Sequence, residues 1–134
     1  MVGQLYPMSF LVAINPLNTA SQFAYSPVKG KIRQITISWP DGSNFLVEAL
    51  FRKGKIQIFP AQTLGTGLPT GVALNNFTLP TPMNYPVGEN DALELYVINH
   101  DGTNTHHISA VLLIEESEDE HKEQVINEER DEAT

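Results

Sequence analysis

The chain has 134 residues, a hydrophobic fraction of 41% and no cysteine. This length suits one hydrophobic core rather than two, and the composition excludes a disordered chain, disulfide bonds and thiolate metal sites. The net charge of −8 lies in the C-terminal end: residues 115–134 hold ten acidic side chains against Lys122 and Arg130, whereas residues 1–114 hold six acids and six bases. We therefore expect a neutral folded body followed by a strongly acidic arm.

The N-terminal segment is the one stretch that resembles a secretion signal. It lacks a basic start, because the first Lys or Arg is Lys29, and its apolar run is interrupted by Pro7, Asn15 and Pro16. We therefore expect no cleaved signal, and no apolar run is long enough to span a membrane. The apolar run 8–14 predicts the first strand.

The next segment alternates between apolar and polar residues. Ile35, Ile37 and Trp39 fall on one face of residues 31–39, which predicts a half-buried strand with a core tryptophan. The letters PDGS at 40–43 predict a turn, because proline presets φ and glycine accepts a positive φ. Strands are expected next at 45–51 and 55–59, joined by a short basic turn.

The second half of the body continues the all-β pattern. Residues 60–71 are rich in Gly, Pro and Thr and predict a long loop, and 72–79 predicts a strand. The prolines at 80, 82 and 86 cannot join a central ladder. Strands are expected at 92–99 and 105–114. The segments 46–51 and 110–114 are apolar on both faces, which indicates central strands or a face covered by another chain.

These elements predict an all-β fold, a single antiparallel β-sandwich that is jelly-roll-like, with about seven or eight strands over residues 1–115. Residues 116–134 are predicted to form an acidic C-terminal arm, extended or partly helical. Ser117 and Glu120 have the spacing of a capping box, but Val125 and Ile126 are the only substantial apolar residues of the arm.

Candidate chemistry is sparse. His100, His106 and Asp101 flank the last turn and are weak candidates for a metal site, but His106 and the neighbouring His107 point to opposite faces of a strand. Glu48 and Glu94 lie in the middle of strands, where isolated solvent-facing glutamates are common. No serine elbow, phosphate loop or HExxH motif is present. We therefore predict no catalytic residue, no metal and no cofactor, and classify the chain as a non-enzyme.

The basic turn holds Arg52, Lys53 and Lys55. An overall isoelectric point near 4.8 argues against nucleic acid, so the acidic arm of a neighbouring subunit is a simpler partner. Tyr85, in the proline-rich loop that is expected after residue 79, is a candidate for surface recognition. The predicted partner-binding residues are Arg52, Lys53, Lys55, Tyr85, Glu116, Asp119, Glu120, Val125 and Ile126.

The segment KGKIRQITISWPDGSNFLVEALFRKGKIQIFP is followed by a Pro/Gly-rich crossover and by DALELYVINHDGTNTHHISAVLLIEE. In strand order and turn placement, about residues 25–116 resemble small β-sandwich virion proteins of tailed phages and related viruses. The resemblance implies a structural virion component, such as a capsid decoration or capsid-associated protein. It implies a homo-oligomer on a larger protein shell, with a terminal arm that contacts neighbouring subunits.

Two other classes remain open from the residues. A carbohydrate- or ligand-binding sandwich module would use Tyr85, Tyr96 and the 60–71 loop. A cupin-like metal-dependent enzyme would use His100 and His106, although cupins gather their ligands from several strands and these histidines crowd one hairpin. We expect the chain in a virion if it is viral, and otherwise in the cytoplasm or exported without a classical signal.

Overall fold

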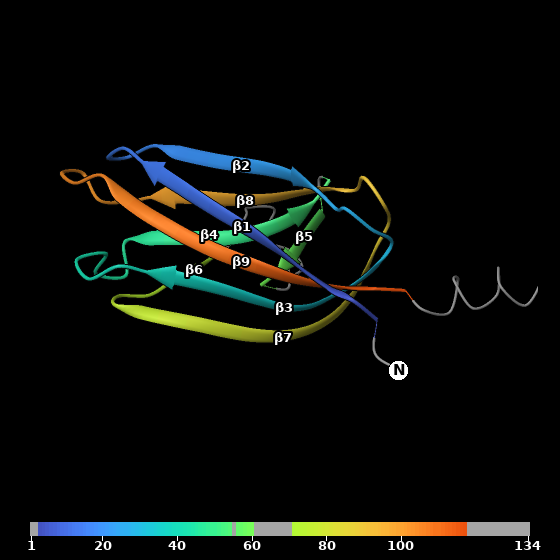
Figure 1. The fold of residues 1–134 in the computed structure, drawn as a ribbon. Coiled ribbons are helices and arrows are strands. Elements are labelled where there is room, and N and C mark those ends of the chain that lie inside the picture. Colours follow the sequence, from blue (N-terminus) through green and yellow to red (C-terminus); the bar gives the residue numbers. More distant parts are fainter. Residues whose placement is uncertain (1–2, 55, 61–70, 118–134) are drawn as a thin grey trace, which may run out of the picture.

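The computed structural model describes residues 3–54, 56–60 and 71–117. These residues form nine β-strands in two facing antiparallel sheets (Figure 1). The strands are β1 (Leu5–Ile14), β2 (Thr19–Tyr25), β3 (Gly30–Trp39), β4 (Val47–Lys53), β5 (Ile56–Phe59), β6 (Val72–Ala73), β7 (Phe77–Val87), β8 (Ala92–Asn99) and β9 (His106–Glu116).

Sheet A has the strand order β1-β9-β3-β7, and sheet B has the order β2-β8-β4-β5, with β6 also paired to β4. Strands β1 to β4 alternate between the two sheets, so each connection among them crosses from one layer to the other. The predicted β-sandwich is confirmed. The two segments that are apolar on both faces are central strands, β4 and β9, as the sequence indicated.

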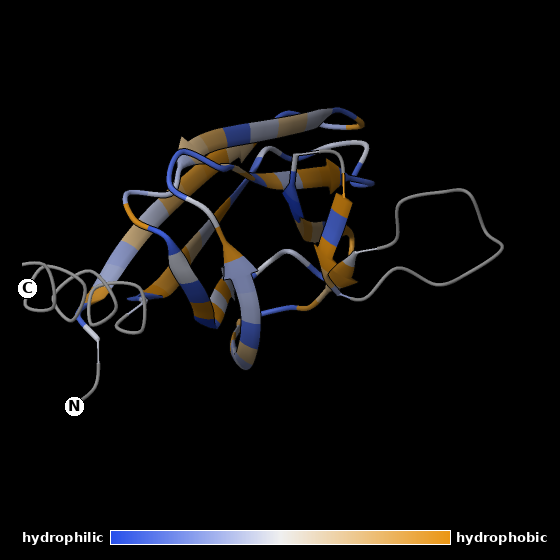
Figure 2. Cartoon of the chain, turned by 90° about the vertical axis from the view of Figure 1, so that its right-hand side faces the viewer, coloured by the Kyte–Doolittle hydropathy of each residue, from blue (hydrophilic) through white to orange (hydrophobic). Residues whose placement is uncertain are grey.

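The core lies between the sheets and is built by alternate residues of each strand. Alternating hydrophobic and hydrophilic bands are visible along the strands in Figure 2. Ile35, Ile37 and Trp39 are buried as predicted, and the indole Nε1–H of Trp39 donates to the carbonyl oxygen of Val47 at 3.0 Å. This hydrogen bond satisfies the one polar group of the Trp39 side chain and links sheet A to sheet B.

Two sequence predictions about the strands are wrong. No strand was expected over residues 19–25, yet β2 forms there at the edge of sheet B. Some of its exposed positions hold aromatic residues, Phe23 and Tyr25, so the hydrophobicity of a residue does not indicate whether it is buried. The strand expected at 72–79 is replaced by the two-residue β6 and by β7, which begins at Phe77 and runs through the three prolines.

The prolines of β7 are compatible with a strand because β7 is an edge. Pro80, Pro82 and Pro86 pair in register with Thr36, Gln34 and Lys31 of β3. Residues at this spacing all point the same way, so the missing N–H groups can face the free edge while the intervening residues bond to β3. The other edge strand of sheet A, β1, is capped differently: its Leu11 N–H donates to Oε1 of Gln22 in β2 at 2.7 Å. Both devices reduce the edge's capacity to recruit a further strand.

The sandwich has two distinct ends. We call the hairpin end the loops 15–18, 40–46, 74–76 and 100–105, which lie together at the left of Figure 1. The root end is the opposite end, where the N-terminal segment enters β1 and where β9 finishes. Within the described residues, no helix is long and apolar enough to cross a membrane.

Candidate functional site

The hairpin end carries two tight turns with an unusual residue in each. In the turn 15–18, the Asn18 N–H donates to the Asn15 carbonyl at 3.2 Å, and Leu17 has φ 57°. In the turn 43–46, the Leu46 N–H donates to the Ser43 carbonyl at 2.9 Å, and Asn44 and Phe45 have φ 50° and 62°. Left-handed backbone at these positions is normally supplied by glycine or asparagine, so the bulky Leu17 and Phe45 are strained there.

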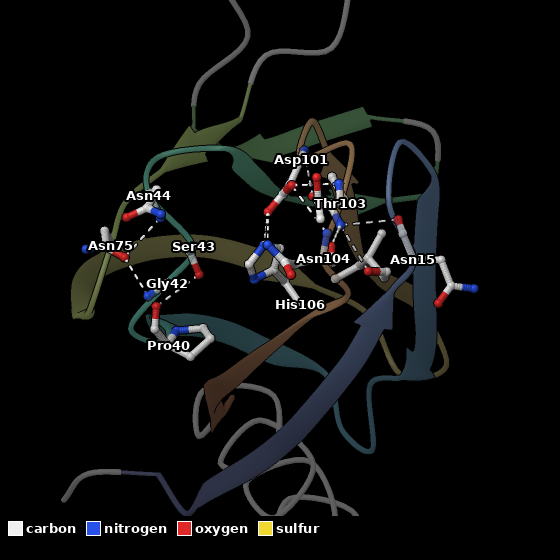
Figure 3. A network of polar contacts seen from close by, with 12 residues as sticks. Asn15, Pro40, Gly42, Ser43, Asn44, Asn75, Asp101, Thr103, Asn104 and His106 are labelled. Atoms are coloured by element: carbon white, nitrogen blue, oxygen red, sulfur yellow. Dashed lines mark hydrogen bonds and ion pairs between the residues drawn. The ribbon is translucent and has the colours of Figure 1, made fainter.

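An asparagine from the next loop holds the 40–46 loop in place. Oδ1 of Asn75 accepts the backbone N–H of Gly42 at 3.0 Å and that of Asn44 at 2.9 Å, as Figure 3 shows. The Asn76 N–H donates to the carbonyl of Pro40 at 3.2 Å. Because these bonds satisfy backbone groups of the residues that lead into Phe45, the strained turn is fixed rather than averaged over several conformations.

A second network surrounds Asp101 (Figure 3). Its Oδ1 accepts the N–H of Thr103 at 2.8 Å, and its Oδ2 lies 3.2 Å from Nδ2 of Asn104 and 2.9 Å from Nε2 of the buried His106. The hydrogen bond from His106, followed by that from Thr103, holds the pKa of Asp101 far below its usual range. The ionised carboxylate therefore organises the 100–105 loop by accepting hydrogen bonds.

Asn99 extends this network into β1. Its side-chain Nδ2 lies 3.1 Å from the Ile14 carbonyl, 3.2 Å from that of Asn15 and 2.9 Å from that of Asn104, while its Oδ1 accepts the Asp101 N–H at 2.9 Å. A buried amide that satisfies this many backbone groups is a structural clamp. The clamp joins the loop after β1 to the loop after β8.

Backbone bonds complete a continuous row of loops. Leu17 N–H donates to the Asp101 carbonyl at 3.1 Å, and His100 N–H donates to the Leu46 carbonyl at 2.8 Å. The loops 15–18, 100–105, 40–46 and 74–76 are thus hydrogen-bonded in sequence across the end of the sandwich. Apolar side chains project from this rigid frame: Leu17 is 71% exposed and Phe45 is 65% exposed, and Leu46 and Phe77 are exposed as well.

The three candidate metal ligands are only partly brought together. Asp101 and His106 are in contact, but Nε2 of His100 lies 3.6 Å from Oε2 of Glu48, outside that pair. His106 is buried and His107 is exposed, as their positions in one strand predicted. Among the described residues, no group of three histidine or acidic side chains is arranged to hold a metal ion. The two mid-strand glutamates, Glu48 and Glu94, also have different partners: Glu48 lies beside His100, and Glu94 forms an ion pair with Arg52.

The basic turn does not present free cations at Arg52 and Lys53. Nε of Arg52 lies 2.8 Å from Oε1 of Glu94, and its guanidinium stacks 4.2 Å from the ring centroid of Tyr96. The Arg52 N–H is not aimed at that oxygen, so the contact is an ion pair rather than a hydrogen bond. Both charges are therefore compensated within one sandwich.

Lys53 is occupied in the same way. Its Nζ lies 3.4 Å from Oδ2 of Asp91 and 5.5 Å from the ring centroid of Tyr85. The Gly88 N–H and then Lys53 lower the pKa of Asp91. Tyr85 was expected in a loop, but it lies in β7, half-buried against the core, because the proline-rich segment is a strand. Lys55 lies outside the described residues.

The arm begins at a firmly held position. Glu116 N–H donates to the carbonyl of Gln4, and Ser117 N–H donates to the carbonyl of Lys29, both at 2.9 Å. Strand β9 ends at Glu116, and Ser117 is still hydrogen-bonded to the body. Tyr6 lies with its hydroxyl 3.4 Å from Oε2 of Glu116. The remaining predicted arm contacts, Asp119, Glu120, Val125 and Ile126, lie outside the described residues, as does the predicted arm conformation.

Sequence reasoning missed Leu17 and Phe45. The letters NPLN at 15–18 and SNFL at 43–46 contain a usable signal, since Asn-Pro and Ser-Asn favour turns. That signal predicts a turn but not a positive φ at a leucine or a phenylalanine. Local preference disfavours this conformation, and only the contacts with Asn75 and Asp101 reveal why it is adopted.

No protein-family model and no curated protein sequence matches this chain. Solved structures do resemble it. A chain in the capsid asymmetric unit of cyanophage Pam1 aligns with a TM-score of 0.55 and 13% sequence identity, covering 87% of this chain and 87% of that chain. A chain of the Bacillus endospore appendages, a family of disulfide-linked pili, aligns with a TM-score of 0.41 and 15% identity, covering 87% and 95%. At this identity, the likeness to the Pam1 chain is a likeness of fold.

Proposed function

We propose that this chain is a structural assembly protein of a virion, of the capsid decoration or capsid-associated kind. Its sandwich would seat on a larger protein shell through the hairpin end, and its C-terminal arm would contact neighbouring subunits. The fold shared with a chain of the Pam1 capsid unit supports this class. The strand pairs β1–β9, β2–β8, β3–β7 and β4–β5 follow the winding of a jelly roll, an architecture that is frequent in viral capsid domains.

The observation that carries the proposal is the strain at Leu17 and Phe45. Each occupies a turn position that prefers glycine or asparagine, and each projects its side chain into solvent instead of the core. A left-handed conformation costs such a residue about 1–2 kcal/mol. An exposed side chain that lowers stability without packing in its own fold is typical of a contact residue, and the rigid frame beneath it reduces the entropy lost on binding.

The arm supplies a second kind of contact. It follows Ser117, which is hydrogen-bonded in the sheet, and the 17 residues 118–134 span at most about 60 Å when fully extended. That reach exceeds the length of one sandwich strand. The net charge of −8 over residues 115–134 favours contacts with basic surfaces of neighbours, and such contacts weaken with salt.

The alternatives receive less support. A ligand-binding module would need free aromatic faces, but Lys53 lies over Tyr85 and Arg52 over Tyr96. A metal-dependent enzyme would need converging ligands. The carboxylate oxygens of Asp101 are instead hydrogen-bonded to the 100–105 loop and to His106. The polar groups that chemistry would use are committed to structural contacts.

The decisive experiment measures incorporation into particles. Virions are purified from cells that carry the wild-type chain or the double variant Leu17→Asn/Phe45→Asn, and the chain is quantified by mass spectrometry. Asparagine tolerates the left-handed region, so the turns persist while the apolar contacts are lost. We expect the variant to be depleted at least tenfold. Phe23→Asn, a comparably exposed aromatic on β2, is the matched control and should incorporate normally.

Two results would overturn the proposal: wild-type chain absent from purified particles, or equal incorporation of the double variant. The arm is tested separately with a chain that ends at Ser117, which removes no described contact. We expect its release from particles at lower salt than the full chain. Equal release of the two chains across ionic strengths would remove the arm from the proposal and leave the hairpin end.

A further inference from the structure

Three of the four sheet edges of the described sandwich carry a feature that hinders the addition of a further strand. The β7 edge contains three prolines, and the β1 edge contains Pro7 and the Leu11 N–H that is bonded to Gln22. The third edge is interrupted, because the four-residue β5 and the two-residue β6 share it. The fourth edge, β2, has seven consecutive paired residues with no proline, no charge and no bulge.

The pairing of β2 with β8 shows which backbone groups of β2 point away from sheet B. At one end, the Asn99 N–H donates to the carbonyl of Asn18, and at the other end the Ser26 N–H donates to the carbonyl of Asp91, both at 2.9 Å. Positions that bond to the neighbouring strand alternate with positions that point outward in an antiparallel pair, so the even-numbered residues of β2 bond to β8. The residues with backbone N–H and C=O groups at the free edge are Thr19, Ser21, Phe23 and Tyr25.

The same four residues present their side chains on the outer face of sheet B. Ala20 and Ala24 pack against the core, so the residues between and beside them face outward. Phe23 and Tyr25 are 56% and 64% exposed. The outward row thus has a half with small hydroxyl side chains, at 19 and 21, and a half with large aromatic side chains, at 23 and 25. No other described strand pairs with this edge, which forms the upper border of the sandwich in Figure 1.

We infer that the β2 edge pairs with the β2 edge of a second copy, in a two-fold antiparallel dimer that joins the two B sheets into one. Hydrogen bonds form only where outward positions of one strand meet outward positions of the other. A two-fold axis at Gln22 gives the register that pairs all seven residues. Four pairs then exchange two bonds each, which gives about eight N–H···O bonds across the dimer.

The strand is complementary to itself in this register, which favours a second copy over an unrelated partner. Tyr25 of each copy lies opposite Thr19 of the other, and Phe23 lies opposite Ser21, so each large side chain meets a small one. Aromatic residues opposite β-branched residues such as threonine are favourable cross-strand pairs. No charged residue precedes Lys29, so the two-fold contact brings no like charges together along the strand. An unrelated strand would not require the two halves of β2 to match each other.

The contact has the size of a reversible interaction. Seven paired residues extend over about 23 Å, and a single pair of strands buries less surface than a standard protein interface. We therefore expect micromolar affinity rather than an obligate dimer. The inference deepens the proposed function by giving copies of the chain a contact with each other. It rests on that function only for its role in assembly, because the pairing itself needs no shell.

The first test is the oligomeric state of the full chain, measured by sedimentation velocity over a micromolar concentration series. We expect a monomer–dimer equilibrium in the wild-type chain. Ser21→Pro removes an N–H that points to the free edge and leaves the bonds to β8 in place, so it should weaken the dimer roughly tenfold or more. Circular dichroism establishes that each variant keeps its fold.

Ser9→Pro on the β1 edge is the matched control. The Glu116 N–H donates to the carbonyl of Gln4, so the odd-numbered residues of β1 point to the free edge, as those of β2 do. Ser9→Pro therefore makes the same chemical change on an edge that takes no part in the proposed pair. It should dimerise like the wild-type chain.

The second test determines the register with single cysteines, because the chain has none of its own. Gln22 lies on the proposed axis, where the two Cα atoms of a pair without hydrogen bonds are about 4.5 Å apart, within the range of a disulfide. Gln22→Cys should therefore form a disulfide-linked dimer on mild oxidation, visible on a non-reducing gel. Thr19→Cys should not, because the two copies of residue 19 lie six positions apart along the strands, about 20 Å.

Each result bears on one part of the inference. A wild-type chain that stays monomeric, or a Ser21→Pro chain that dimerises as tightly as Ser9→Pro, overturns pairing through β2. Cross-linking of Thr19→Cys as efficient as that of Gln22→Cys overturns the register. An intact dimer that is absent from purified particles counts against the proposed function alone. Incorporation depends on the hairpin end in that proposal, so Phe23→Asn remains a control there even where it loosens the dimer.

Discussion

Nε2 of His106 lies 2.9 Å from Oδ2 of Asp101, inside a loop whose backbone the same carboxylate organises. Both side chains are buried, and the Asp101 carboxylate also binds Thr103 and Asn104. The pair is therefore part of the network that holds the 100–105 loop. The pair also makes the free energy of unfolding of the sandwich depend on pH.

The first prediction concerns acid stability. The pKa of Asp101 is lowered in the folded state, first by the hydrogen bond with His106. A group with a lowered folded pKa stabilises the protein above its unfolded pKa of about 3.9 and loses that contribution as the pH falls below it. Asp101→Asn should lower the free energy of unfolding at neutral pH and flatten its decline in acid, measured by urea denaturation at a series of pH values. The exposed Glu89→Gln serves as control, and parallel pH profiles for wild type and Asp101→Asn would contradict the assignment.

The second prediction concerns the place where the arm begins. A Cβ at Gly30 would overlap the carbonyl oxygen of Glu115 on the adjacent strand β9. Gly30→Ala must push these two strands apart, so we expect a loss of about 1–3 kcal/mol in the free energy of unfolding. Gly102→Ala is the control, because a Cβ at Gly102 meets no atom within 4 Å and should leave stability nearly unchanged. Equal stabilities of the two variants would show that β3 and β9 do not approach this closely.

The third prediction concerns the strained turn. Phe45→Gly creates the Asn-Gly pair that a turn with two positive φ values prefers, and it removes a side chain that is mostly in solvent. We expect the free energy of unfolding to rise by about 0.5–1 kcal/mol. Phe23→Gly removes a similarly exposed aromatic from the strand β2 and should lower it by about 1 kcal/mol. Thermal or chemical denaturation separates these outcomes, and a loss of stability in Phe45→Gly equal to that in Phe23→Gly would remove the argument for strain.

The strands that could be predicted carry apolar residues at their buried positions, either in alternation with polar residues or in a continuous apolar run. Strand β8 lies at 92–99 as expected because Leu93, Leu95 and Val97 alternate with less buried residues. Strand β2 was missed because its exposed positions include Phe23 and Tyr25, so the period of two is absent from its letters. Strand β7 was mistaken for a loop because prolines exclude a central strand, and edge position is a property of the sheet rather than of the segment.

For the candidate site too, the sequence predicted notable residues but not the contacts that they make. The sequence identified the residues around the last turn, His100, Asp101 and His106, as chemically notable. It had no means to separate His100 from the other two, because Glu48 approaches from a strand more than fifty residues earlier. Likewise, Arg52 and Lys53 looked like a free basic patch, and their compensation by Glu94 and Asp91 depends on the pairing of β4 with β8 and on the turn that precedes β8.

The all-β sandwich and the neutral body could be predicted from the amino-acid sequence, because alternation, turn residues and charge counts are local or additive properties. Which loops form the hairpin end, and why Leu17 and Phe45 hold left-handed conformations, became visible only in the folded chain. These features arise where strands distant in sequence meet. Their energies come from hydrogen bonds such as those of Asn75 and Asn99, which bind backbone groups of other segments.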